Sequence, residues 1–467
     1  MMKPLVMVLL LWTAICSAAP RAQLAGMTDE KTAEPLPPAS QSCVSFEMFA
    51  ALHHRSMTSG HPSWMMGERF ANLEEALEGY RRTGVSLVAY DGQRYVPASR
   101  TDDAGIDYLI PKMARGLGLD LVGSLKLFLL LLVLSSAAAG LSALFLTFSD
   151  WISRTVVILC VLPLVFISYE AKDLYAIQSA VVVGVVPWVL YLVKNSKSRF
   201  GMEVFLLLVG LGTGISDLLR ASSGIGVAIF AGCIVLFSSG RKLSGRLLLV
   251  AALLVGAVIP RLYFIHLLHS RDTYLYRHDP GYLPTSGTHP FWHSVYIGFG
   301  FLSNPYVSAY KDGVAVQTVC SISPQAGYVS AEYEAVLKRQ VWRLIREDPE
   351  FMFQTLGAKL GVIGLFLILF AHLGLPSAFW YPKAWPVELG FWCALGFNAL
   401  FGILVVPHYP YLLGYIAFAV LYGIYSICHA IDCGILRSLW QARDGESKNA
   451  TRLPERDEYS ELIQSQR

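Results

Sequence analysis

Two adjacent carboxylates, Asp102 and Asp103, precede a long apolar run that begins near residue 121. A carboxylate that is partly desolvated near a membrane surface can act as a general base, because desolvation raises its pKa toward neutrality. A structural role is the alternative. Apolar residues recur at helical spacing after the pair, so Thr101 or Asp102 could cap a helix while the second acid interacts with the helix dipole. The sequence leaves open which acid would be the base.

A second polar group lies between two later apolar runs, in the sequence SYEAKD over residues 168–173. It supplies Glu170, Lys172 and Asp173 as candidate substrate-binding residues. Asp173 is also the candidate ligand for a divalent cation, Mg²⁺ or Mn²⁺, bound to phosphate oxygens. Alternatively, these polar residues only form a solvent-exposed turn between two spans, and this interpretation stays open.

A site that binds phosphate oxygens also needs positively charged side chains. Arg220 follows the apolar run that ends near residue 219, and a guanidinium at that depth suits a lipid-linked phosphate or pyrophosphate. Lys359, just inside a later apolar run, is a weaker candidate for the same contact. A charge at the end of a span often only extends toward water, which is the structural alternative.

The segment richest in polar and aromatic residues, 266–355, contains His278, Asp279, His289 and His293. Aromatic rings with scattered His and Asp often line clefts for carbohydrates or lipid headgroups, so these four are candidate substrate-binding residues. Ordinary packing within a loop is the alternative. His289 and His293 have the spacing of a helical zinc pair. Pro290 between them and the absence of an obvious third ligand argue against zinc.

Composition assigns the chain to the membrane proteins. Hydrophobic residues make up 54% of the 467 positions and charged residues only 15%, which is typical of a polytopic membrane protein. The net charge is only +3, and the basic residues gather near the ends of apolar runs. This pattern disfavours nucleic-acid binding and makes the lipid bilayer the expected partner.

Apolar windows of roughly 17 to 25 residues predict an all-α, polytopic bundle of about nine to ten transmembrane helices. The first window also fits a cleavable signal peptide, and both readings stay open. The windows lie near residues 4–19, 121–147, 155–168, 174–193, 201–219, 223–237, 247–265, 356–375, 388–406 and 411–431, of which 155–168 and 223–237 are short.

The distribution of Lys and Arg predicts the orientation. Basic residues at 194–199 and 241–246 have the same parity as Lys3 and the C-terminal tail, so we expect these segments in the cytoplasm. The long connections then face the extracytoplasmic side of a membrane that we expect to be a bacterial inner membrane. The predicted segments are a signal peptide or first span (1–19), a first outer loop (20–120), a transmembrane bundle (121–265), a second outer loop (266–355), a further bundle (356–431) and a cytoplasmic tail (432–467).

Both outer loops are predicted to contain local structure. Residues 73–82 have helical spacing, and residues 85–98 predict a hairpin with Asp91-Gly92 at the turn. Residues 331–355 predict a charged amphipathic helix that can lie on the membrane interface. Cys43 and Cys320 fall in different outer loops and could form a disulfide in an oxidising compartment, or remain two unrelated thiols.

Short stretches of the chain resemble the GT-C superfamily of polytopic membrane glycosyltransferases, which includes the protein O-mannosyltransferases and the lipid A aminoarabinose transferases. The similar stretches are TDDAGIDYLIPKMARGLG, YEAKD, DLLRASSGIG, HPFWHSVYIGFGFLSNP and DPEFMFQTLGAKLG. The resemblance implies an inverting transfer of a sugar from a polyprenyl-phosphate donor to a lipid, glycan or protein acceptor on the outer face. It implies that Asp102 or Asp103 is the base and that Glu170 or Asp173 positions a metal or the acceptor. The family usually places its first acid soon after the first span, whereas roughly eighty residues intervene here.

The residues support the same chemistry without the family. Glycosyl transfer needs a base for the acceptor proton and positive charge for the departing phosphate. Two rivals remain, namely a transporter or flippase of lipid-linked saccharide and a non-catalytic assembly protein for envelope polysaccharide. A transporter is expected to carry ionisable groups or broken helices at mid-membrane, whereas most charge here lies at the span ends.

Overall fold

The computed structural model describes the chain over residues 43–50, 67–98, 103–171, 174–195, 199–237, 242–282 and 290–434. Helices dominate this part of the chain, and eight of them are long and apolar enough to cross a membrane. The predicted all-α polytopic bundle is therefore confirmed at this level, with one small hairpin added to it. The predicted span 4–19 and most of the predicted tail lie outside the described residues.

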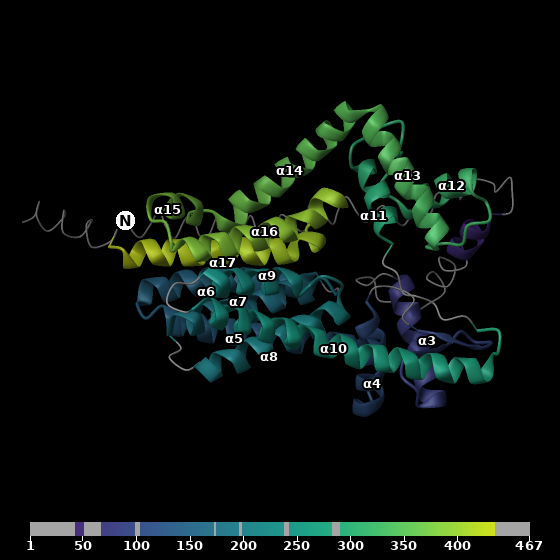
Figure 1. The fold of residues 1–467 in the computed structure, drawn as a ribbon, viewed down its shortest axis with the longest axis horizontal. Coiled ribbons are helices and arrows are strands. Elements are labelled where there is room, and N and C mark those ends of the chain that lie inside the picture. Colours follow the sequence, from purple (N-terminus) through teal and green to yellow (C-terminus); the bar gives the residue numbers. More distant parts are fainter. Residues whose placement is uncertain are drawn as a thin grey trace, which may run out of the picture.

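The long apolar helices form the bundle of Figure 1, in which α14 runs obliquely to the others. They are α5 (Leu121–Thr147), α6 (Trp151–Glu170), α7 (Ala176–Asn195), α8 (Arg199–Leu219), α10 (Leu243–His278), α14 (Pro349–Ala371), α16 (Trp385–Leu404) and α17 (Leu413–Asp432). Each overlaps one predicted span, with ends that differ by a few residues. The predicted short span 155–168 belongs to the full-length α6. The other, now α9 (Ile225–Phe237), has 13 residues and is about 20 Å long, which is less than the hydrocarbon thickness of ~30 Å.

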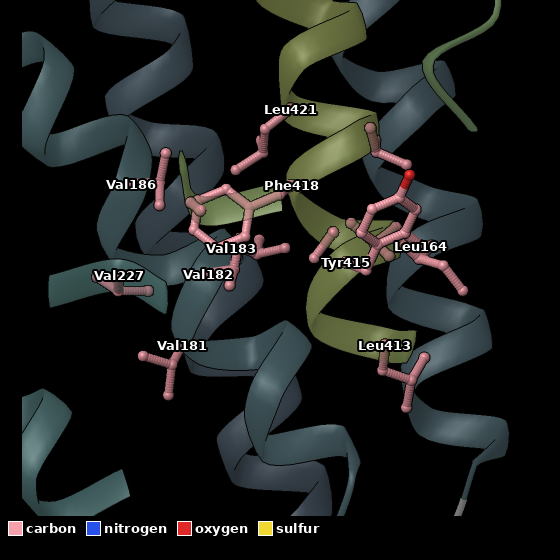
Figure 2. Packing of buried hydrophobic residues seen from close by; sticks show 14 of the residues in the cluster. Leu164, Val181, Val182, Val183, Val186, Val227, Leu413, Tyr415, Phe418 and Leu421 are labelled. Carbon is pink, nitrogen blue, oxygen red and sulfur yellow. The ribbon is translucent and has the colours of Figure 1, made fainter. Parts of the chain in front are cut away.

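Helix α17 forms the centre of the bundle. Its residues are buried on nearly every side, and it contacts α6, α7, α14 and α16. A helix that is apolar all round is expected in the interior, and α17 has this character. Figure 2 shows Phe418 of α17 beside Val182 and Val183 of α7, and Tyr415 of α17 beside Leu164 of α6. Many apolar side chains of the other spans are exposed on the outside of the bundle.

The described residues of the predicted first outer loop, 67–117, fold as two helices and a hairpin; we call them the first outer segment, after the predicted side of the membrane. These elements are α3 (Gly67–Thr83), β1 (Val88–Tyr90), β2 (Tyr95–Pro97) and α4 (Ala104–Leu117). The predicted helix and hairpin are both confirmed, and Tyr90 pairs with Tyr95 across the turn. The Asp91 carboxylate accepts hydrogen bonds from the backbone of residues 93 and 94, and Gly92 has φ of 93°. Only a residue tolerant of positive φ fits there, which explains the Asp-Gly signal.

Helix α10 continues past the end of the bundle and supports this segment. It has 36 residues, so it is about 54 Å long, well beyond the 247–265 window predicted as a span. Its outer half packs against α3 and the hairpin through Phe264. The buried Arg271 donates from Nη1 to the carbonyl oxygen of Ala98 at 3.2 Å. The apolar window at 247–265 therefore predicted only the first, more apolar part of α10.

The second outer segment has a hydrophobic core of its own. It contains α11 (Phe291–Gly298), the short 3-10 turn η2 (Phe299–Phe301), α12 (Asp312–Ile322) and α13 (Ala331–Glu347). The helix predicted over 331–355 is divided at Asp348, because the following Pro349 begins α14. Figure 1 shows α13 and α14 meeting at a sharp angle at the outer end of the bundle.

A disulfide joins the two outer segments. Cys43 and Cys320 are bonded, with their Cα atoms 5.7 Å apart and 277 residues between them in sequence. The backbone N–H of Val44 also donates to the carbonyl oxygen of Pro324 at 3.0 Å. Of the two readings of these cysteines, the structure contains the cross-link, which places residues 43–50 on the second outer segment.

Candidate functional site

Asp103 is held by two arginines at the outer end of the bundle. Arg220 Nη1 donates to both carboxylate oxygens, at 3.0 Å and 2.9 Å, and Arg69 Nη2 donates to Oδ2 at 2.9 Å. The Asp103 side chain is only 5% exposed, so these ion pairs are largely shielded from water. Charge-assisted hydrogen bonds in such surroundings are among the stronger polar contacts in a protein.

A close helix contact and a fixed turn bring Asp103 and Arg220 together. A Cβ atom on Gly105 would lie 2.6 Å from the carbonyl oxygen of Leu218, so glycine permits the first turn of α4 to approach the end of α8. Asp217 fixes the turn that follows α8, because its Oδ1 accepts from the backbone N–H of Gly224 at 2.8 Å. Arg220 lies within this turn and is directed back toward α4.

The Asp103 side chain contacts arginines and not the backbone of the helix that follows it. It occupies the position before α4, yet its side chain makes no capping hydrogen bond. Its oxygens instead accept from Arg69, Arg220 and, at 3.4 Å, the backbone N–H of Ala221. A carboxylate engaged in this way is a structural anion. Asp102, the other candidate base, lies outside the described residues.

Aromatic contacts extend from Arg220 to the second outer segment. The Arg220 guanidinium lies 4.3 Å from the centre of the Tyr175 ring, which packs at 4.9 Å against Tyr411. The Tyr310 hydroxyl donates to the Tyr411 hydroxyl at 3.2 Å. Burial raises the pKa of Tyr310, so it remains a neutral phenol. We call this set the outer junction; it comprises Arg69, Asp103, Tyr175, Arg220, Tyr310 and Tyr411.

The outer junction includes some of the predicted site residues and not others. Asp103 and Arg220 are in direct contact, as chemistry at one site requires. Glu170 is the exposed last residue of α6, close in sequence to Tyr175. The remaining candidates of these turns, Lys172 and Asp173, lie outside the described residues, as does His289 of the second outer loop. Their predicted roles therefore stay predictions.

His278 and Asp279 lie at the far end of α10. Arg261 contacts Asp217 at 3.4 Å near the outer junction, and His278 is about 25 Å further along the same helix. The His278 ring stacks on Tyr274 with 4.1 Å between centroids. Asp279 accepts from the backbone N–H of Gly281 at 2.9 Å. The His278 ring also contacts Tyr95 of the hairpin, so the structure places this end of α10 there and not with Asp103.

His293 is part of the core of the second outer segment. Its Nδ1 pairs with the Tyr333 hydroxyl at 2.8 Å and its Nε2 with Asp312 Oδ1 at 3.0 Å. The Glu334 carboxylate accepts from the backbone N–H groups of residues 292 and 293, at the start of α11. Both ring nitrogens are therefore engaged. Across the described ranges, no group of three or more His, Cys, Asp or Glu side chains has the geometry of a metal site.

Lys359 connects α14 to the end of α16. Its side chain is 1% exposed, and Nζ donates to the carbonyl oxygens of Ile403 at 3.1 Å and Val405 at 2.7 Å. These carbonyl groups are at the C-terminal end of α16, where a cation also complements the helix dipole. Lys359 therefore binds carbonyl oxygens of the protein in this structure, which is an alternative to the weaker expectation that it contacts a lipid phosphate.

Several residues of the outer junction were not among the candidates predicted from the sequence. Arg69 precedes the helical segment that was recognised, and the tyrosines at 175, 310 and 411 resemble the many other aromatic residues of the chain. Tyr175 and Tyr411 lie at the start of apolar runs, which is their only sequence signal, and Arg69 and Tyr310 have none. Contact across more than one hundred residues, as between Asp103 and Arg220, has no local signature.

No family model, curated protein or solved structure matches the chain.

Proposed function

We propose that this protein is an integral-membrane glycosyltransferase of GT-C type, which moves a sugar from a polyprenyl-phosphate donor to a lipid, glycan or protein acceptor. The observation that carries the proposal is the meeting of Asp103, Arg220 and Tyr175 at one end of the bundle. These residues belong to the first outer segment, the turn after α8 and the turn before α7. The stretches that contain the predicted acids are thus neighbours of a single arginine.

Asp102 and Asp103 have different roles in this proposal. Asp103 is the anion that orients Arg220, since its carboxylate accepts hydrogen bonds from two guanidinium groups. Asp102, its neighbour in sequence, is then the base that takes the proton of the acceptor hydroxyl. Arg220 supplies positive charge for the phosphate that departs from the sugar. Direct displacement inverts the anomeric centre and requires no covalent enzyme intermediate.

The orientation is proposed from charge and from the disulfide. Disulfides persist in oxidising compartments, so the Cys43–Cys320 bond supports an extracytoplasmic location for both outer segments. The basic connections at the other end of the bundle favour the cytoplasm. A bacterial inner membrane with the outer junction on the extracytoplasmic face satisfies both conditions.

A divalent cation remains a proposal attached to Asp173. An Mg²⁺ or Mn²⁺ ion would neutralise phosphate charge, and Glu170 is the described acid nearest to Asp173 in sequence. The transfer chemistry proposed for Asp102 and Arg220 does not require the ion.

Single substitutions in the reconstituted full chain test the proposal. With a radiolabelled polyprenyl-phosphate sugar, we expect Asp102→Asn to reduce transfer at least about a hundredfold and to leave the unfolding temperature unchanged. Glu78→Gln, on an exposed part of α3, is the matched control and should behave as wild type. Full activity of Asp102→Asn would refute the assignment of the base.

A non-catalytic assembly protein is the second candidate function. It is favoured by the use of Asp103 and His293 in internal contacts and by the position of His278 far along α10. A flippase remains the transport alternative. If the wild-type protein moves a lipid-linked saccharide across a vesicle membrane without cleaving it, and Asp102→Asn does so equally well, the flippase replaces the transferase.

A further inference from the structure

Helix α13 has one buried face and one basic face. Tyr333, Leu337, Val341 and Leu344 are buried in the core of the second outer segment. The side chains on the opposite side of the helix are exposed. We call these cationic residues the basic face of α13; they are Lys338, Arg339, Arg343 and Arg346.

The basic face lines a shallow groove with an aromatic ring in it. The groove encloses about 570 Å³, and Trp342 and Glu347 complete its lining. Glu347 is the only acid in the lining of this groove, and it lies 3.5 Å from Arg343. Positive charge is therefore in excess in the groove. The Trp342 side chain is 46% exposed. Four cations around an exposed indole are suited to an anionic ligand that also has an apolar part.

The position of the groove identifies that ligand. Helix α13 ends at Glu347 and the span α14 begins at Pro349, so Arg346 is close in sequence to the point where the chain enters the membrane. Phe353, in the second turn of α14, is 76% exposed, as expected for a lipid-facing side chain. The angle between the two helices is held by Asp348, whose Oδ2 accepts from the Tyr306 hydroxyl at 2.9 Å. Figure 1 shows α13 beyond the end of the bundle, running at a steep angle to most of the spans.

We propose that the basic face of α13 binds the headgroups of anionic phospholipids in the leaflet at the outer end of the bundle. The guanidinium and ammonium groups bind the phosphates, and Trp342 lies at the boundary between headgroups and acyl chains. Basic amphipathic helices with tryptophan bind anionic membranes in this manner, each cation strengthening the attraction roughly fivefold. Charge complementarity and continuity with the lipid-facing surface of α14 favour lipid over a soluble anion. The inference is independent of the glycosyltransferase proposal.

The experiment uses the full chain in nanodiscs. Brominated acyl chains quench nearby tryptophans, so phosphatidylcholine discs are doped with equal fractions of brominated phosphatidylglycerol or brominated phosphatidylcholine. The chain has ten tryptophans, and the difference between wild type and Trp342→Phe isolates the signal of Trp342. We expect the brominated anionic lipid to quench this signal at a mole fraction at least about tenfold lower than the neutral one, and salt to reduce the difference.

Charge variants provide the control. Arg339→Gln/Arg343→Gln/Arg346→Gln should abolish the preference for the anionic lipid. The matched triple variant Arg81→Gln/Arg94→Gln/Arg277→Gln removes the same charge from exposed positions elsewhere and should keep it. Equal quenching by both lipids, or none, would overturn the proposal. A response of Trp342 to inorganic pyrophosphate in neutral discs, without lipid preference, would overturn it in favour of a soluble anion.

Discussion

Arg220 Nη1 donates to both carboxylate oxygens of Asp103, at 3.0 and 2.9 Å, and so joins residues that are 117 positions apart. The contact attaches the first outer segment to the turn after α8. Tyr175 lies against the other side of the same guanidinium, with 4.3 Å between it and the ring centre. One arginine thus connects the outer ends of several chain segments.

Loss of the Asp103 charge should destabilise the fold. Asp103→Asn leaves two guanidinium groups beside a neutral side chain in a largely buried position. Because an uncompensated buried charge is costly, we expect the free energy of unfolding to decrease by about 3 kcal/mol. Chemical unfolding in detergent measures this change. Asp102→Asn, measured in parallel, should unfold like wild type, and equal losses from both substitutions would contradict the division of roles.

The close approach of α4 to α8 depends on Gly105. A methyl group there would lie 2.6 Å from the carbonyl oxygen of Leu218, so Gly105→Ala must displace α4 and lengthen the contact between Asp103 and Arg220. We expect a loss of stability of about 2 kcal/mol, in line with overpacking of a helix contact. Gly116→Ala is the control on the same helix, because nothing lies within 4 Å of its added methyl group. That variant should be neutral or slightly stabilised.

The disulfide should stabilise the outer segments. Cys43→Ser or Cys320→Ser opens a loop of 277 residues, and the expected loss is about 2 to 4 kcal/mol. Peptide mapping without reduction should find Cys43 and Cys320 in one cross-linked species in protein from native membranes. Cys433→Ser removes an exposed free thiol and should change neither result. Recovery of both outer cysteines as free thiols would contradict the bond.

The buried amine of Lys359 should be a stabilising contact. Lys359→Met keeps most of the side-chain volume and removes both hydrogen bonds to the end of α16. Hydrogen bonds from a charged group contribute about 1.5 to 3 kcal/mol each, so a total loss of about 3 kcal/mol is expected in the unfolding experiment. Lys126→Met, at an exposed position of α5, is the control and should lose little. Equal stability of the two variants would exclude this role for Lys359.

The membrane architecture follows from the sequence because it depends on local composition. A run of about twenty apolar residues is long enough to cross the hydrocarbon layer, and in lipid its backbone must satisfy its own hydrogen bonds. The windows therefore marked every long apolar helix within the described residues. The hairpin at Asp91-Gly92 could also be predicted from a local signal, because one residue of its turn requires positive φ. Hydropathy could not show that α10 extends to His278, since its outer half packs on other protein segments.

The arrangement of the polar residues was decided only by the tertiary structure. The sequence identified Asp103, Arg220 and His293 as residues capable of chemistry, and their types alone are compatible with a base, a phosphate ligand or a metal ligand. The fold placed Asp103 against Arg220 and enclosed His293 between Tyr333 and Asp312. Partners distant in sequence determine whether a charged group is available or engaged. A one-dimensional pattern contains the residue types, but the distances between them arise when the helices pack.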